Sequence, residues 1–448
     1  MSKGRVVVIG AGVAGLVTTR VLAEHAEHVT VIERNVLEDD AEPRRGVPQG
    51  RHAHGLLASG EAVLRELFPG MIEELVAGGG QVVSMRQITW WQGGGYRAPS
   101  TAPDSIFFSR PYLELGIRRR VMALPNVSVV HAGVEGLEFA QGRVVAVNVD
   151  GGDGLASVAA DLVVDTSGRS SRVGTWLSAG GFAEPPVSQV HIDMGYASRL
   201  YRRTPGRLPE GSCMIIIGSP PDSKRLGVAF PIDGDRWIVT LCGMHGDHAP
   251  TDDEGFLAFA RSLPTGDVAG VIASEEPLGP IMTHRLGSDQ WRHFEKVSRH
   301  PAGFLALGDS ICSFNPIYGQ GMSSASLQAL ALRAQVERHG LSSPSLPRAF
   351  YKAAAKVIKN PWAVAAGGDF TFPETTGEKP PMVDRINAYI GKAFVAAQHD
   401  PVVAAAVFDV LNLQASPPSL MKPSMVLRVR RGSKLGPTGN PTPMTAGV

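Results

Sequence analysis

The sequence predicts an α/β protein with a Rossmann-type lobe, an inserted and mainly antiparallel β-sheet lobe, and C-terminal helices. Three observations carry this prediction. A strand-like run, a glycine-rich turn and a helical pattern open the chain, which is the order of a βαβ unit. The same order returns near residue 304. Between them, four strand-like runs from residue 191 to residue 241 alternate with Pro/Gly-rich turns, which indicates an antiparallel sheet.

These patterns divide the chain into four parts. We expect a discontinuous Rossmann-type lobe at residues 1–80, 105–185 and 286–345, and a sheet lobe at residues 81–104 and 186–285. Residues 346–431 form a helical pattern that we expect to be broken at Pro361 and Pro373. Residues 432–448 are rich in Pro, Gly and Thr, and we expect them to form a flexible tail.

The composition excludes several classes of protein. Lys plus Arg total 43 and Asp plus Glu total 42, so the chain lacks the basic field of a nucleic-acid binder. No apolar run of about 18 residues predicts a membrane span. Three separated cysteines favour a reducing compartment over a disulfide framework or a zinc site, and the N-terminus lacks a signal-peptide pattern. We therefore expect a cytoplasmic protein.

The first glycine-rich turn predicts a dinucleotide site. Gly10, Gly12 and Gly15 form a G-x-G-x-x-G pattern between a strand and a helix. In this pattern the glycines permit a tight turn, a close approach of the backbone to a pyrophosphate, and packing of the helix on the strand. Glu33 ends the second strand, where a carboxylate can accept hydrogen bonds from ribose hydroxyls.

The second strand and turn favour FAD as the dinucleotide. Asp309 follows a strand and offers an acceptor for the hydroxyls of a ribityl chain. Ten residues later a glycine-rich turn around Gly319 and Gly321 opens a helix. Free N–H groups at a helix N-terminus stabilise the negative charge of a reduced isoalloxazine ring. Only one G-x-G-x-x-G fingerprint is present, so we expect no separate NAD(P)H-binding domain.

The sequence resembles the FAD-dependent monooxygenases related to aromatic hydroxylases, and within them the flavin epoxidases of polyether-antibiotic biosynthesis. The resemblance covers about three quarters of the chain. Besides the two glycine-rich turns, it rests on residues 45–49 (RGVPQ) with His52 and His54, on Arg110, on residues 163–169 (VVDTSGR), on residues 196–199 (YASR), and on residues 315–322 (NPIYGQGM).

The resemblance implies a set of cofactor-binding residues. Asp309 would hold the ribityl chain, Arg110 would lie near it or near the pyrophosphate, and the turns at residues 46–49 and 316–322 would border the flavin ring. The full expected set is Gly10, Gly12, Gly15, Glu33, Arg34, Arg45, Gly46, Val47, Pro48, Gln49, Arg110, Val134, Asp165, Gly168, Asp309, Pro316, Gly319, Gln320, Gly321 and Met322.

The chain departs from the aromatic hydroxylases at two positions. Ser167 precedes Gly168 where those enzymes have an Asp-Gly pair implicated in FAD and NAD(P)H contacts, and Ser323 stands where they often have Asn. The docking of NAD(P)H and the choice between NADH and NADPH therefore stay open. For Arg44, a solvated surface pair with Arg45 is as compatible with the sequence as a role at the cofactor site.

Other signals have simpler interpretations. His52 and His54 lack a third ligand, so we predict no metal and a structural role near the flavin loop. Tyr196 and Arg199 lie on a predicted strand and are candidates for substrate binding, although an aromatic residue on a sheet face commonly belongs to the core. Cys312 is expected to be a small buried apolar residue. No residue type and spacing assigns a catalytic acid or base.

The function expected from the resemblance is an oxygenation. NAD(P)H would reduce FAD, and O2 would form a flavin C4a-hydroperoxide that epoxidises or hydroxylates a hydrophobic alkene-bearing polyketide or terpenoid of secondary metabolism. The sheet lobe and the C-terminal helices would bind this substrate, free or on a carrier protein. The alternative is an FAD-dependent alkene reductase of the prenyl type. A halogenase would need a Trp-x-Trp-x-Ile-Pro block, which the sequence lacks. A prenyl-binding escort protein would not keep the Gly-Asp motif.

Overall fold

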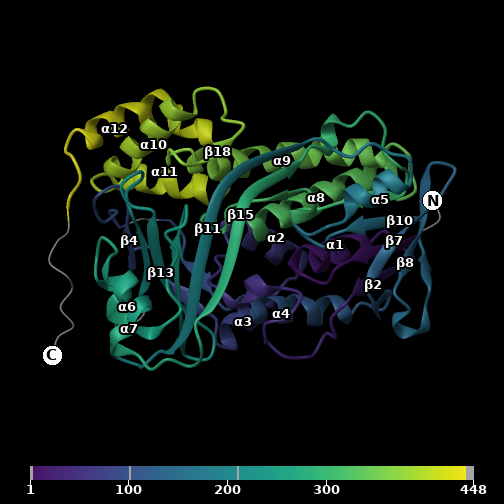
Figure 1. Cartoon of the computed structure of the whole chain (residues 1–448), viewed down its shortest axis with the longest axis horizontal. Coiled ribbons are helices and arrows are strands. Elements are labelled where there is room, and N and C mark those ends of the chain that lie inside the picture. Colours follow the sequence, from purple (N-terminus) through teal and green to yellow (C-terminus); the bar gives the residue numbers. More distant parts are fainter. Residues whose placement is uncertain (1–3, 100–101, 209–210, 440–448) are drawn as a thin grey trace.

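A computed structural model describes residues 4–99, 102–208 and 211–439 of the protein. It shows the predicted α/β class, with a parallel sheet at one end, a larger sheet at the other, and C-terminal helices beside the larger sheet (Figure 1). Two long strands, β11 and β15, run between the two ends. The predicted boundary at residue 286 therefore falls inside β15 (Met282–Arg292).

Five parallel strands form the sheet of the Rossmann-type lobe, in the order β16-β10-β1-β2-β6. Its central strands carry runs of buried apolar residues, Val6–Ile9 in β1 and Leu162–Val164 in β10, because other elements cover the sheet. The strands are β1 (Arg5–Ile9), β2 (His28–Glu33), β6 (Val127–His131), β10 (Leu162–Asp165) and β16 (Phe304–Ala306). The lobe also contains α1 (Val13–Ala23), α2 (Ala58–Leu67), α3 (Met71–Ala77), α4 (Arg110–Met122), α5 (Val173–Ala179), α8 (Gly321–His339), and a small sheet of β7 (Val134–Ala140), β8 (Arg143–Val149) and β9 (Ser157–Ala159).

The second sheet has eight strands and is antiparallel except where β4 and β12 pair. Its path is β17-β15-β11-β14-β13-β12-β4, and β18 pairs with β11. The strands besides β15 are β4 (Ile88–Trp91), β11 (Val187–Arg202), β12 (Cys213–Ile217), β13 (Arg225–Ile232), β14 (Arg236–Gly243), β17 (Cys312–Ser313) and β18 (Thr376–Gly377). A short pair, β3 (Gln81–Val83) and β5 (Ser105–Phe107), lies outside this sheet.

The two-residue period of the strands separates a packed face from an open face. On β14, Trp237, Val239 and Leu241 belong to a core with Phe256 of α6. The alternate side chains, such as Thr240, border a cavity on the other face. Helices α6 (Asp253–Arg261) and α7 (Asp267–Ser274) cover the packed face. One face of the sheet therefore contributes side chains to the cavity wall.

The C-terminal region contains α9 (Leu346–Asp369), α10 (Val383–Ala396), α11 (Pro401–Leu411) and α12 (Pro423–Ser433). The expected break at Pro361 is wrong, because α9 continues through this buried proline to Asp369. One missing N–H costs less here than losing the packing of the long helix. Within the described part of the chain, no helix is long and apolar enough to cross a membrane.

The expected flexible tail begins inside α12, which ends at Ser433. Thr438 then donates its N–H to Gln398 Oε1 over 2.8 Å, and Gly439 forms a bridge with Gly95. Residues 432–439 therefore pack against the sheet lobe, and the rest of the predicted tail, 440–448, lies outside the described residues.

Candidate functional site

A single cavity of about 1220 Å³ connects the two lobes. Its wall includes the glycine-rich turns of the Rossmann-type lobe, the open face of the second sheet, and parts of α9, α10 and α11. A site for one small molecule commonly has a volume of about 300–1,000 Å³. The cavity therefore has room for a large cofactor together with a substrate.

The first glycine-rich turn leaves its backbone open to this cavity. Gly10 has φ +96°, a conformation that side chains disfavour. A Cβ atom at Gly15 would lie 1.9 Å from Gly10 O, so this glycine allows α1 to pack on the turn. A Cβ at Gly12 would meet only Arg110 Nη2, at 3.9 Å. Gly12 thus keeps the N-terminus of α1 accessible to an anionic group.

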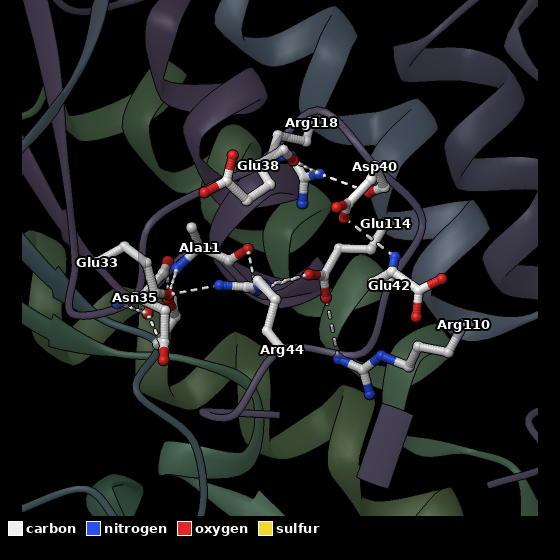
Figure 2. A network of polar contacts seen from close by, with 12 residues as sticks. Ala11, Glu33, Asn35, Glu38, Asp40, Glu42, Arg44, Arg110, Glu114 and Arg118 are labelled. Atoms are coloured by element: carbon white, nitrogen blue, oxygen red, sulfur yellow. Dashed lines mark hydrogen bonds and ion pairs between the residues drawn. The ribbon is translucent and has the colours of Figure 1, made fainter. Parts of the chain in front are cut away.

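Glu33, at the end of β2, belongs to a buried network of charges (Figure 2). Its Oε2 accepts the N–H of Ala11 over 2.9 Å and lies 3.1 Å from Arg44 Nη1. Arg44 Nη2 also lies 2.6 Å from Glu114 Oε1 and donates to Ala11 O over 2.9 Å. Arg110 approaches the other oxygen of Glu114 at 3.6 Å. Arg44 therefore links the acidic end of β2 to α4.

This network keeps Glu33 ionised. Burial alone would raise the pKa of its carboxyl, but the charge of Arg44 and the N–H groups of Ala11 and Asn35 outweigh burial and lower it. Arg44 is the residue that sequence reasoning missed. The resemblance favoured Arg45, yet Arg45 is exposed and lies outside the cavity, whereas the Arg44 side chain is 9% exposed. Neighbouring residues point in different directions, and only the folded partners Glu33 and Glu114 distinguish the two arginines.

Asp309 lies at the second turn, directly after β16, and lines the cavity. Its Oδ1 would be 3.9 Å from a Cβ built on Gly321, which begins α8. Burial raises the pKa of this carboxyl, while Arg110 and Arg169 lower it. No hydrogen bond to the Asp309 carboxylate occurs among the described residues. Asp309 can therefore accept hydrogen bonds from hydroxyl groups of a ligand.

The turn before α8 presents a second group without a partner. Gln320 is 1% exposed and lines the cavity, and neither atom of its amide has a hydrogen bond among the described residues. The turn is held against the end of α9, because Asn315 Nδ2 donates to Asp369 Oδ1 over 2.9 Å. Buried amides are normally paired, so Gln320 indicates a polar ligand at this position.

These features fit FAD. Glu33 and the open turn at Gly12 match a ribose and a pyrophosphate, the free carboxylate of Asp309 matches the ribityl hydroxyls, and the unpaired amide of Gln320 matches the polar edge of an isoalloxazine ring. The residues that carry these features all line the same cavity.

The structure brings most of the predicted site residues to the cavity wall. They are Gly10, Gly12, Glu33, Arg34, Gly46, Val47, Gln49, Arg110, Val134, Gly168, Tyr196, Asp309, Pro316, Gly319, Gln320, Gly321 and Met322. Five predicted residues do not line it, namely Gly15, Arg45, Pro48, Asp165 and Arg199.

Asp165 and Arg199 have other partners. The Asp165 carboxyl is fully buried and accepts hydrogen bonds from the Ser167 N–H over 2.9 Å and from the Ser171 hydroxyl over 2.5 Å, so it shapes the loop after β10. Arg199 donates to Gly279 O over 2.7 Å and to Asp253 over 2.7 Å. It lies three residues after Tyr196 on β11, so its side chain leaves the opposite face of the sheet.

The part of the cavity beyond the cofactor positions has a mostly apolar and aromatic lining, with a few polar and charged side chains such as Lys224 and Asp384. Its lining includes Trp90, Met194, Ile215, Phe230, Ile390 and Phe408. In the adjacent pairs Trp90-Trp91 and Phe107-Phe108, Trp90 and Phe107 line the cavity, whereas Trp91 and Phe108 lie in hydrophobic cores. Among the described residues, no group of three or more His, Cys, Asp or Glu side chains could hold a metal ion.

His52 was predicted to have a structural role near the flavin loop, but its partners were not predicted. His52, in the loop after β2, donates or accepts at Nδ1 with Ser198 Oγ of β11 over 2.7 Å. Its ring meets that of Tyr196 edge to face, with centroids 4.3 Å apart. His284 of β15 lies 5.4 Å from the Tyr196 ring. Sequence offered only the His-Ala-His pattern, because the partners of His52 come from a distant strand.

Comparisons with known proteins agree with this fold. No model of a known protein family matches the chain. The chain is 34% identical over 419 residues to Protein Rv3254 of Mycobacterium tuberculosis, covering 90% of this chain and 88% of that protein. It is 26% identical to the kynurenine 3-monooxygenase of Salinispora tropica, covering 79% and 77%. The solved structure of the flavin-dependent brominase Bmp2 superposes with a TM-score of 0.68 at 15% identity, covering 97% and 99%.

The match to Rv3254 spans both lobes, the match to the kynurenine 3-monooxygenase is shorter and weaker, and the solved structure shares the fold. These relationships agree with the fit of FAD along the cavity wall. The chain therefore belongs to the same family as Protein Rv3254 and to the FAD-dependent monooxygenase superfamily.

Proposed function

We propose that this protein uses NAD(P)H and O2 to insert one oxygen atom into an apolar small molecule, by hydroxylation or by epoxidation. One observation carries the proposal: the residues that fit FAD and the apolar wall of the sheet lobe line the same cavity. The cofactor and an apolar ligand could therefore be in contact without intervening water. The name of the Salinispora relative, kynurenine 3-monooxygenase, supports oxygenation as the reaction type.

Bound FAD would supply the redox chemistry by accepting two electrons and reacting with O2. The chain's own residues would bind and orient it. Glu33 would accept hydrogen bonds from the ribose, Asp309 from the ribityl chain, and the Gln320 amide would pair with the polar edge of the ring. The N-terminus of α8 would favour negative charge near that ring. The apolar wall would exclude water from the reacting atoms.

We further propose an alkene-bearing polyketide or terpenoid as the substrate, presented free or on a carrier protein. Aromatic and aliphatic side chains from β4, β13 and α11, such as Trp90, Phe230 and Phe408, support this class because they offer an apolar surface. Oxygen transfer to an electron-rich alkene requires no catalytic base. This agrees with the lowered pKa values of His52, His54 and His284, which burial makes weaker bases.

Isotopic labelling tests the proposal. The FAD-loaded protein is incubated with NAD(P)H under isotopically heavy O2 and a panel of polyenes, terpenoids and aromatic compounds. We expect one product that gains a single heavy oxygen atom, and no product from the Asp309→Ala variant without bound flavin. An alkene reductase would instead add two hydrogens to an alkene in the absence of O2 and would incorporate no label. That outcome would replace the proposed function.

A further inference from the structure

The protonation state of His52 follows from a chain of hydrogen bonds across the open face of the second sheet. Ser198 of β11 and Thr240 of β14 are directly paired across the two strands, and their hydroxyl oxygens are 2.6 Å apart. Ala53 donates its N–H to Thr240 Oγ1 over 3.0 Å. Ser198 Oγ is also 2.7 Å from His52 Nδ1. His52, Ser198 and Thr240 are all buried, at 1–4% exposure.

Only one direction of this chain uses every proton. Among the described residues, Thr240 Oγ1 has two partners, Ala53 and Ser198, and the Ala53 N–H can only donate. Ser198 Oγ is the acceptor that the described residues offer to the Thr240 hydroxyl, so we assign the Thr240 proton to this hydrogen bond. The Ser198 hydroxyl in turn donates to His52 Nδ1. Buried hydroxyl protons without an acceptor are disfavoured, so the network assigns the tautomer.

His52 then carries its proton on Nε2. Burial, together with His54, His284 and Arg51, lowers the pKa of His52 to about 3, so the ring is neutral at pH 7. No hydrogen bond to Nε2 occurs among the described residues, and His52 lines the cavity. His54 has the opposite tautomer, since its Nδ1 must donate to the carbonyl oxygen of His52 over 2.9 Å. The two neighbouring histidines thus present one donor and one acceptor.

We propose that His52 Nε2–H is a hydrogen-bond donor for the substrate, and that it selects an otherwise apolar molecule carrying a carbonyl oxygen. The donor lies in the wall that also contains Tyr196, whose hydroxyl has no hydrogen bond among the described residues. A neutral donor suits a carbonyl because it pairs with the oxygen without burying a charge. Ser198 and Thr240 act as positioning residues. This inference rests on the proposed function only in placing the substrate in this cavity.

The test compares two probes that differ only at the acceptor, acetylnaphthalene and ethylnaphthalene. Their dissociation constants are measured with the FAD-loaded protein in the absence of NAD(P)H. A net hydrogen bond contributes about 0.5–1.5 kcal/mol, so the wild type should bind the ketone about two- to tenfold more tightly than the hydrocarbon. In His52→Phe, which keeps the ring and removes the donor, this ratio should fall to about one. Using a ratio cancels general effects of the substitution on the cavity.

A spectroscopic readout separates a hydrogen bond from mere shape. With an isotopically labelled carbonyl, the infrared stretch of the bound ketone should move to lower frequency in the wild type and return toward its apolar-solvent value in His52→Phe. Ser198→Ala, which leaves the ring in place but frees its tautomer, should give an intermediate shift. Equal binding of both probes by the wild type, no binding of the ketone, or an unchanged stretch in His52→Phe would overturn the proposal. Because no turnover is needed, a failure of oxygenation would leave these outcomes unaffected.

Discussion

Arg44 Nη1 lies 3.1 Å from Glu33 Oε2, and both side chains are 9% exposed. This pair anchors the first glycine-rich turn, since Glu33 ends β2 and also accepts the N–H of Ala11 in that turn. Glu114 of α4 holds the other side of the same guanidinium at 2.6 Å. Removing Arg44 would therefore leave the buried Glu33 without its counter-ion, and Glu114 with Arg110 at 3.6 Å.

We expect Arg44→Met to lower the free energy of unfolding of the apoprotein by about 3 kcal/mol, because an unpaired buried charge is costly. Urea denaturation measures this change. The matched control is Arg45→Met at the exposed neighbouring position, where the change should stay within about 0.5 kcal/mol. Equal effects of the two substitutions would contradict the burial of the Arg44 network.

The same pair predicts a pH dependence. The pKa of Glu33 is lowered in the folded protein from its ordinary value of 4.5, so this group contributes stability above that pH and loses it as the pH falls through the folded pKa. Without the charge of Arg44, the pKa of Glu33 should be lowered less. The difference in free energy of unfolding between wild type and Arg44→Met should therefore narrow below about pH 4.5. A difference that stays constant during acidification would argue against this linkage.

Two alanine substitutions in the first turn should have different consequences. In Gly15→Ala the new Cβ would lie 1.9 Å from Gly10 O, so α1 must move away from β1 and the fold is destabilised. In Gly12→Ala the Cβ has only Arg110 Nη2 near it, at 3.9 Å, so the apoprotein keeps its stability while the pyrophosphate loses its close approach. Thermal unfolding of the apoprotein and titration with FAD measure the two effects. Loss of stability in Gly12→Ala would show that this turn is more crowded than described.

Asp309→Ala should weaken FAD binding by about 10- to 100-fold, since hydrogen bonds to a charged acceptor contribute about 1.5–3 kcal/mol. Asp309→Asn keeps an acceptor and should lose less affinity. Quenching of flavin fluorescence on titration measures both. Full flavin occupancy in Asp309→Ala would show that the ribityl chain lies elsewhere.

Asp289 and Asp369 lie side by side beneath the turn that opens α8. Burial raises the pKa of Asp289 to about 6, although a hydrogen bond from Asp369 and the charge of Arg169 oppose this. Burial and the charge of Asp289 raise the pKa of Asp369 still further. One of the two carboxyls therefore keeps a proton at neutral pH.

A raised carboxyl pKa contributes stability at low pH and loses it as the pH rises through the folded value. For Asp289 we expect this loss between about pH 4 and about pH 6. Asp289→Asn removes the charge and should be more stable than the wild type at pH 8, with the advantage disappearing near pH 4. Denaturation at several pH values tests this expectation. A variant less stable than the wild type at pH 8 would indicate that the Asp289 charge has a compensating partner.

The local patterns of the sequence determined the α/β class and the two glycine-rich turns. Gly10, Gly12 and Gly15 lie within six positions of one another, and Asp309 lies three residues after the end of β16. Such features can be predicted because neighbouring residues alone decide the turn and the helix that follows. The consecutive order of strand, glycines and helix along the chain also supported the resemblance to the flavin monooxygenases.

Pairing between distant residues could not be predicted in this way. Arg44 and Glu114 are 70 positions apart, and His52 and Ser198 are 146 positions apart. Arg199 was a plausible candidate in sequence, but the pleat of β11 turns it away from the cavity that Tyr196 lines. The sequence by itself predicted a flavin site and the turns that would build it. The tertiary structure decided which arginine is buried, which histidine nitrogen holds a proton and which face of the sheet meets the ligand, because each depends on partners that only folding brings within hydrogen-bond distance.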